Sequence, residues 1–206
     1  MIREEAFGQT DSTSVVDRFG VWLSGRSVRR ATGSLRDLDL GDFGCGYHAS
    51  FVRSVLPELA SVTLGDVDLA SDLIEHPKVT AIKGELPGTL ERVPSASLDV
   101  VLCLSVLEHL ADPDQALSHF HRMLRPGGVC VVNVPTWMGK FFLEVSAFRL
   151  GLSPPREMDD HKRYYDPRDL WPELVKAGFP PHAIRCRRHK FGLNTIAVCR
   201  NEETIS

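Results

Sequence analysis

The chain of 206 residues predicts an α/β fold built on a doubly wound, mostly parallel sheet. Short apolar runs alternate with helical patterns over residues 38–134, which is typical of βαβ units. The first of these runs ends in an acid and a Gly-x-Gly turn, at the position where open sheets bind ligands. The run Leu98–Leu104 is apolar except for Asp99, as expected of a strand buried on both faces.

A helix is expected before the first strand, over about residues 14–30. Its apolar stripe consists of Val15, Val16, Phe19, Trp22 and Leu23. We expect the stripe to pack on the edge of the sheet, with a cover over the ligand-binding mouth as the alternative.

The first strand reaches Asp42, and the following turn contains Gly44, Cys45 and Gly46. Glycines allow a sharp turn and a close approach to a ligand, and the next helix offers free N–H groups. Together with Ala49, the two glycines also fit the dinucleotide fingerprint. Asp42 argues against that reading, because a carboxylate two residues before Gly44 would repel a pyrophosphate. It favours a ligand that carries a positive ammonium group.

The second apolar run ends at Asp66, which lies 20 residues after Gly46. An acid at about this spacing commonly binds ribose hydroxyls. Asp68 is the competing candidate, and simple capping of the next helix is the alternative role for Asp66. We favour Asp66 as the ribose-binding acid.

Further elements follow in the same alternation. A strand over residues 79–82 leads into Glu85 and Leu86. After the fourth strand, Asp112 and Pro113 provide the N-cap and first position of a helix that runs to about residue 124. The Arg-Pro-Gly-Gly turn at 125–128 then ends this helix, and a fifth strand is expected over 129–134.

These motifs, in this order, resemble the class I S-adenosylmethionine-dependent methyltransferases. Residues 98–135, with the Glu108-His109 pair and the Pro-Gly-Gly turn, are similar to the type 11 group. The resemblance implies a Rossmann-like seven-stranded sheet in the order 3-2-1-4-5-7-6, with an antiparallel last strand. The final two strands are expected near 183–188 and 194–200. His48 departs from the commonest pattern, because many members carry a third glycine there.

The resemblance implies S-adenosyl-L-methionine as the cofactor and S-adenosyl-L-homocysteine as its product. Asp42 is then expected near the ammonium group, Asp66 at the ribose, and Glu85 with Leu86 at the adenine. The complete set of expected cofactor-binding residues is Asp42, Gly44, Cys45, Gly46, Asp66, Val67, Glu85, Leu86, Cys103, Leu104 and Ser105. No metal is expected.

Three residues are candidates for catalysis. His109 follows the fourth strand closely, and His161 lies in a polar segment after the fifth. Imidazole titrates near neutral pH, so either histidine suits a general base. Tyr164, or its neighbour Tyr165, could line the acceptor pocket or face the sulfonium. A merely hydrogen-bonding histidine and a solvated loop are the alternatives.

One domain is expected over residues 1–206. Its parts are an N-terminal helical cap (1–35), a cofactor-binding core (36–135), a substrate lid (136–165), and a C-terminal helix with an antiparallel strand pair (166–206). The aromatic-rich stretch 137–152 is expected to belong mainly to the core, with a lid or a dimer contact as alternatives.

Composition limits the classes of partner and the cellular location that are expected for the chain. A net charge of −3, and a basic run at 185–190 whose members would alternate between strand faces, argue against nucleic acid as the main partner. No stretch approaches the roughly 18 apolar residues that span a bilayer, and the acidic start lacks a signal-peptide pattern. Five cysteines without a C-x-x-C pair indicate reduced thiols and a cytoplasmic location.

The expected function is methyl transfer to a small-molecule, sugar or lipid-linked acceptor. A non-catalytic cofactor-binding scaffold of the same fold is the main alternative, and an NAD-dependent Rossmann enzyme is disfavoured by Asp42. The acceptor atom (oxygen, nitrogen or carbon) and the oligomeric state, including a homodimer, are left open by the sequence.

Overall fold

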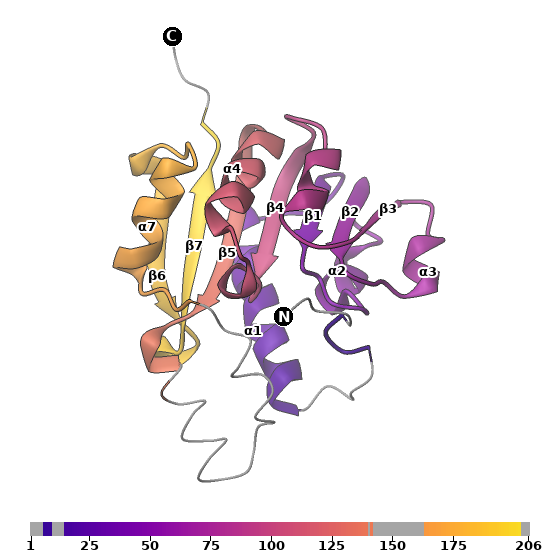
Figure 1. Ribbon diagram of the computed structural model, residues 1–206. Coiled ribbons are helices and arrows are strands. Elements are labelled where there is room, and N and C mark those ends of the chain that lie inside the picture. Colours follow the sequence, from indigo (N-terminus) through magenta and orange to yellow (C-terminus); the bar gives the residue numbers. More distant parts are fainter. Residues whose placement is uncertain (1–5, 10–14, 140, 142–162, 203–206) are drawn as a thin grey trace.

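The computed structural model describes residues 6–9, 15–139, 141 and 163–202 (Figure 1). Seven strands of this part form one sheet in the order β3-β2-β1-β4-β5-β7-β6. The strands are β1 (Asp39–Phe43), β2 (Ser61–Asp66), β3 (Val79–Lys83), β4 (Leu98–Leu104), β5 (Leu124–Pro135), β6 (Ile184–His189) and β7 (Asn194–Arg200). The first five are parallel, and β7 pairs antiparallel with both β5 and β6. The predicted fold class and strand order are confirmed.

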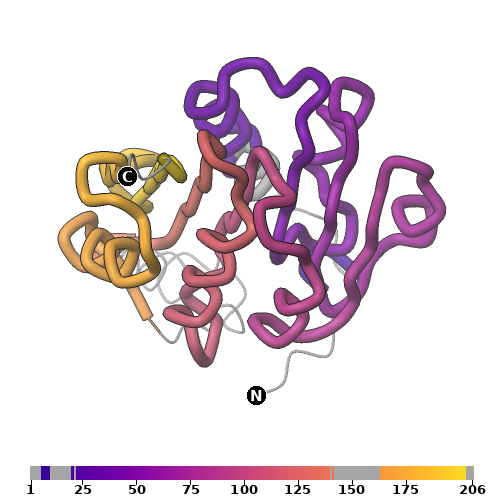
Figure 2. The backbone as a smooth tube through the Cα atoms, turned by 90° about the horizontal axis from the view of Figure 1, so that it is seen from above, coloured from indigo at the N-terminus to yellow at the C-terminus, as the bar shows by residue number. Residues whose placement is uncertain are grey.

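Helices cover both faces of the sheet, which produces a three-layer arrangement when the backbone is seen from above (Figure 2). One apolar cluster includes residues of α1 (Val15–Thr32), α2 (Ser50–Val55) and α3 (Ser71–Ile74). The other includes residues of α4 (Pro113–Met123) and α7 (Pro167–Lys176). Because both faces are buried, β4 apart from Asp99 and most of β5 consist of apolar residues.

Local sequence explains where α4 begins, and tertiary pairing explains where it ends. Asp112 caps the helix by accepting a 3.0 Å hydrogen bond from the Gln115 amide, and Pro113 occupies the first turn. The fifth strand, however, begins at Leu124 rather than after the glycine turn. Leu124 pairs with Leu98, and the register shifts between Leu98 and Val100, so the strand absorbs the predicted turn.

The predicted apolar stripe of α1 is wrong at Trp22, which is 56% exposed and lies under the guanidinium of Arg26. The face of α1 that is buried instead carries small residues, among them Ser24, Ser27 and Val28. A Cβ on Gly25 would lie 2.9 Å from the Phe51 ring, so this glycine allows α1 to pack closely on α2. None of the described helices combines the length and apolar character that crossing a bilayer requires.

The parallel strands all end at one edge of the sheet, the lower edge in Figure 1. Since β7 is antiparallel to β5 and pairs Asn194 with Pro135, the η4 turn (Lys190–Gly192) that precedes it lies at this edge too. This edge, where open α/β sheets bind ligands, is called the carboxyl edge below.

Candidate cofactor and acceptor site

The glycine turn after β1 has a backbone conformation that requires glycine at two positions. Gly44 and Gly46 have φ values of +80° and +72°, which L side chains rarely tolerate. A Cβ on Gly44 would lie 2.1 Å from Cγ2 of Val106, in the segment after β4. Gly44 therefore lets the turns after β1 and β4 meet at the carboxyl edge.

Two acids stand at the ends of the adjacent strands β1 and β2. The Asp42 side chain is buried, and no described residue donates a hydrogen bond to its carboxylate. Burial raises the pKa of the Asp42 carboxyl to about 7, and the nearby charge of Asp66 adds to the rise. A cation placed beside this carboxyl would lower its pKa again and favour its ionised form.

Asp66 is bound to the glycine turn and does not cap a helix. Its Oδ2 accepts a 2.7 Å hydrogen bond from the Gly46 amide, and its Oδ1 accepts one of 2.8 Å from the Val67 amide. The next helix, α3, begins at Ser71 with Ala70 as its N-cap. The capping alternative for Asp66 is therefore wrong.

Asp68, the competing acid, is held by other protein groups. It forms an ion pair of 2.7 Å with Lys83 and accepts hydrogen bonds from the Gln9 side chain and the Leu69 amide. These contacts lower its pKa, with the Lys83 hydrogen bond as the main cause. Asp68 thereby fastens the N-terminal turn 6–9 to the sheet.

That N-terminal turn packs directly on the glycine turn, which sequence reasoning did not predict. The Phe7 carbonyl accepts a 2.9 Å hydrogen bond from the Tyr47 amide and would lie 3.1 Å from a Cβ on Gly46. The Phe7 side chain is 44% exposed. Nothing in the short polar sequence around these residues indicates such a contact.

The other expected cofactor residues lie after β3 and at the end of β4. The Gly84 amide donates to the Asp66 carbonyl at 3.0 Å, so the turn carrying exposed Glu85 and half-buried Leu86 starts beside Asp66. Leu104, the last residue of β4, is half-buried, and the next residue, Ser105, is exposed. The Cys103 side chain, in contrast, points into the core, where it is fully buried.

The Cys45 thiol lies within the glycine turn, close to the two acids. Its pKa is raised by burial and, further, by the charges of Asp42 and Asp66. All five cysteines of the chain are free, in agreement with the expectation of reduced thiols.

Two of the catalytic candidates, His109 and Tyr164, lie in segments at the carboxyl edge. His109 is half-buried at the end of η2 (Leu107–His109), directly after β4. Tyr164 is half-buried, and its ring lies 5.3 Å from that of Trp137. The next residue, Tyr165, donates its amide to the Pro135 carbonyl at the end of β5. His161, the third catalytic candidate, lies outside the described residues.

Two buried polar residues at this edge were not among the predicted site residues, although Glu108 belongs to the Glu108-His109 pair. Asn133 is fully buried on β5 and donates from Nδ2 to the Ser105 hydroxyl at 3.2 Å, while its Oδ1 accepts no hydrogen bond from the described residues. Glu108 is 1% exposed beside His109. Asn133 could have been found as the one polar residue within the apolar run 129–134.

The aromatic segment after β5 begins in solvent and not in the core. Among its described members, Trp137 is 53% and Phe141 is 68% exposed. The expectation of a mainly buried segment is therefore wrong for these positions, and the remainder of 137–152 lies outside the described residues.

Known proteins of similar sequence agree with this geometry. Residues 26–183 match the family model described as a methyltransferase domain. A probable S-adenosylmethionine-dependent methyltransferase of Mycolicibacterium smegmatis is 32% identical over 149 residues, which cover 68% of this chain and 51% of that protein. A ubiquinone biosynthesis O-methyltransferase of Psychrobacter arcticus is 27% identical over 150 residues, or 67% and 57% of the two chains. The chain thus spans about half the length of the curated relatives it matches.

Similar solved structures support the fold. The crystal structure of the [4+2]-cyclase SpnF superimposes with a TM-score of 0.68 at 15% identity, covering 97% of this chain and 87% of that one. Since that protein is named a cyclase, this likeness carries no information on the reaction. The family match over residues 26–183 is informative, because S-adenosyl-L-methionine is the cofactor that it implies. The buried Asp42 carboxyl beside a close-approach glycine turn fits that cationic ligand, and the chain belongs to the methyltransferase domain family.

Proposed function

We propose that the chain transfers a methyl group from S-adenosylmethionine to a small-molecule, sugar or lipid-linked acceptor. The observation that carries this proposal is the Asp42 carboxyl, buried at the glycine turn and raised in pKa to about 7. An acid in this position suits an ammonium group and opposes a pyrophosphate, which argues against a nicotinamide dinucleotide.

In this proposal the cofactor spans the ends of β1, β2 and β4. Asp42 attracts the ammonium group, the backbone of Gly44, Cys45 and Gly46 approaches the amino-acid portion, and Asp66 with Val67 receives the ribose. Glu85 and Leu86 border the adenine, and the backbone of Cys103, Leu104 and Ser105 faces the sulfonium. When bound, the cofactor supplies an electrophilic methyl group on a positively charged sulfur.

The protein's contribution to the reaction is mainly to hold the acceptor. Orientation of an acceptor atom against the methyl group is worth up to roughly 7–11 kcal/mol. His109 then removes the acceptor's proton, with His161 or Tyr164 as alternative groups, and Trp137 contributes an apolar wall.

A homologue named for O-methylation in ubiquinone biosynthesis is consistent with a hydroxyl acceptor on a small molecule. A hydroxyl must lose its proton during methylation, and a positioned base accelerates such a reaction by about 10²–10⁴-fold. We infer that the residues of 136–165 cover this acceptor, as a lid of a single domain.

Calorimetric titration with S-adenosylhomocysteine, with NADH as the control, tests the proposal. Micromolar binding of the first ligand alone supports it, and screening of hydroxylated acceptors with a labelled methyl donor would follow. Binding of NADH alone would overturn it. Tight cofactor binding without turnover on any acceptor would favour the non-catalytic scaffold.

A further inference from the structure

Strand β6 is an edge strand with one free side. It is last in the strand order, and β7 pairs with it from His189 to Ile184. Within the described chain no strand pairs with its other side, where backbone N–H and C=O groups remain available. A strand edge of this kind can accept one more strand from another protein.

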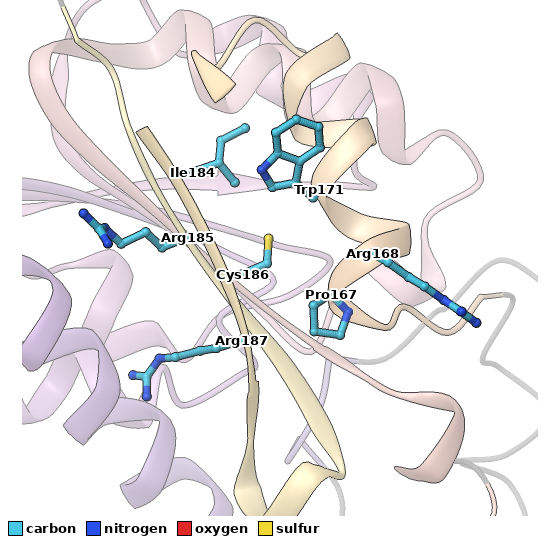
Figure 3. A pocket seen from close by; sticks show the side chains of 7 residues that line it. All are labelled: Pro167, Arg168, Trp171, Ile184, Arg185, Cys186 and Arg187. Atoms are coloured by element: carbon cyan, nitrogen blue, oxygen red, sulfur yellow. The ribbon is translucent and has the colours of Figure 1, made fainter. Parts of the chain in front are cut away.

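The two faces of β6 differ in chemistry. Ile184 and Cys186 face α7, where Pro167, Arg168 and Trp171 complete an open groove of about 750 Å³ (Figure 3). Trp171 is 37% exposed in this groove. Arg185 and Arg187 point to the opposite side of the strand in the same view.

The charged side chains of β6 itself, Arg185, Arg187 and Arg188, are all positive. Arg185 and Arg187 are exposed, and no described carboxylate lies within ion-pair distance of either. Arg188, on the α7 side, reaches Asp166 at 3.8 Å. An incoming strand would therefore meet Arg185 and Arg187 on one of its faces, and on the other a mixed groove in which Arg168 stands beside Ile184, Cys186 and Trp171.

This pattern disfavours a second copy of the same chain as the occupant. Pairing β6 with another β6 would bring arginine against arginine, and like charges on facing strands are destabilising. Arginines on an edge commonly protect it from self-association. A partner with carboxylates at those positions would meet attraction where the second copy meets repulsion.

We propose that the free edge of β6 binds an extended segment of a partner protein in which acidic residues alternate with apolar ones. The backbone of that segment extends the sheet. Its acidic side chains face Arg185 and Arg187, and its apolar side chains enter the groove beside Trp171. This site is independent of the cofactor site, because none of its residues belongs to the turns after β1, β2 and β4.

Fluorescence anisotropy of labelled peptides with the full chain tests the proposal. The probe is a seven-residue peptide that alternates glutamate and valine, and the comparison peptide carries lysine in place of glutamate. We expect saturable binding of the acidic peptide only. The double variant R185E/R187E should reverse this preference, weakening the acidic peptide by about tenfold or more.

A matched control separates local from general charge effects. Arg36→Glu with Arg92→Glu makes the same change of charge at two exposed positions away from β6, and it should leave peptide binding within about twofold. S-adenosylhomocysteine affinity, measured on every variant, should stay unchanged. Loss of cofactor binding in the unmodified chain would contradict the proposed function and not this surface.

Backbone methylation distinguishes strand pairing from simple charge attraction. Alternate amides of a paired strand point toward β6, so N-methylation of one alternating set should abolish binding, whereas methylation of the other set should be tolerated. Equal effects of both sets, or no effect, would overturn the proposal. So would a single-stranded RNA that binds more tightly than the acidic peptide and displaces it, or β6-dependent dimers of the unmodified chain.

Discussion

The Gly46 amide donates a 2.7 Å hydrogen bond to Asp66 Oδ2, which joins the glycine turn after β1 to the acid that ends β2. The two strands run parallel and in register from Asp39 with Ser61 to Phe43 with Gly65. Asp66 consequently reaches the turn directly beyond the strand ends. Gly46 and Asp66, which lie 20 residues apart in the sequence, are therefore in direct contact.

Replacement of Asp66 should weaken cofactor binding. Asp66→Ala removes the acceptor of the Gly46 and Val67 amides as well as the proposed ribose contact, and we expect S-adenosylhomocysteine affinity to fall by about tenfold or more. Calorimetric titration measures it. Asp68→Ala is the matched control, because Asp68 binds Lys83 and Gln9 instead. A larger loss in the Asp68 variant would reverse the assignment of the two acids.

Asp42→Asn should stabilise the protein without ligand while weakening ligand binding. The folded-state pKa of about 7 exceeds the ordinary value of 3.8, so the native state binds the proton more tightly than the unfolded chain. Ionisation of Asp42 therefore costs stability, increasingly from about pH 4 to pH 7 and then constantly. The gain from Asn should follow that course and reach a few kcal/mol at most. Chemical denaturation at about pH 5 and pH 8 measures it, and an equal gain at both would contradict this account.

Ligand affinity should also depend on pH through Asp42. A cationic group prefers the ionised carboxylate, so S-adenosylhomocysteine should bind about tenfold more weakly at about pH 6 than at about pH 8. Binding at the lower pH should be accompanied by proton release, which calorimetry in two buffers of different ionisation enthalpy detects. The Asp42→Asn variant should lose this dependence, and its persistence would place the titrating group elsewhere.

The sequence predicted those parts of the fold that local rules determine. Asp112 caps α4 as expected, and the acids and glycines at the strand ends meet at one edge because parallel strands bring them there. Prediction from sequence failed where contacts with residues distant in the sequence determine which side chains are buried and where a strand begins. Trp22 fits an apolar stripe by spacing, yet α1 packs through smaller residues against Phe51. Leu124 joins β5 because Leu98 offers a pairing partner, which no local propensity reveals.

Gly44→Ala should destabilise the fold through both backbone and steric effects. A φ of +80° costs an L residue roughly 1–2 kcal/mol, and the new Cβ would collide with Val106, which adds about 1–3 kcal/mol. Gly127→Ala provides the matched control, because its φ is +82° with no atom within 4 Å of the added Cβ. Thermal denaturation should show a larger loss at Gly44, partly recovered by Val106→Ala in the double variant. Equal losses at both glycines would remove the steric part of the argument.

His109→Gln should separate the chemical step from cofactor binding. If His109 takes the proton of a hydroxyl acceptor, kcat should fall by about 10²–10⁴-fold while S-adenosylhomocysteine affinity stays within about twofold. The loss of a base should also remove the acidic limb of the pH profile of kcat/KM, which a merely structural role would leave in place. His119→Gln changes an imidazole on α4 that accepts a hydrogen bond from Arg122 and should leave kcat unchanged. Unchanged kcat in the His109 variant would transfer the role to His161 or Tyr164, and the same measurement on His161→Gln and Tyr164→Phe would then distinguish them.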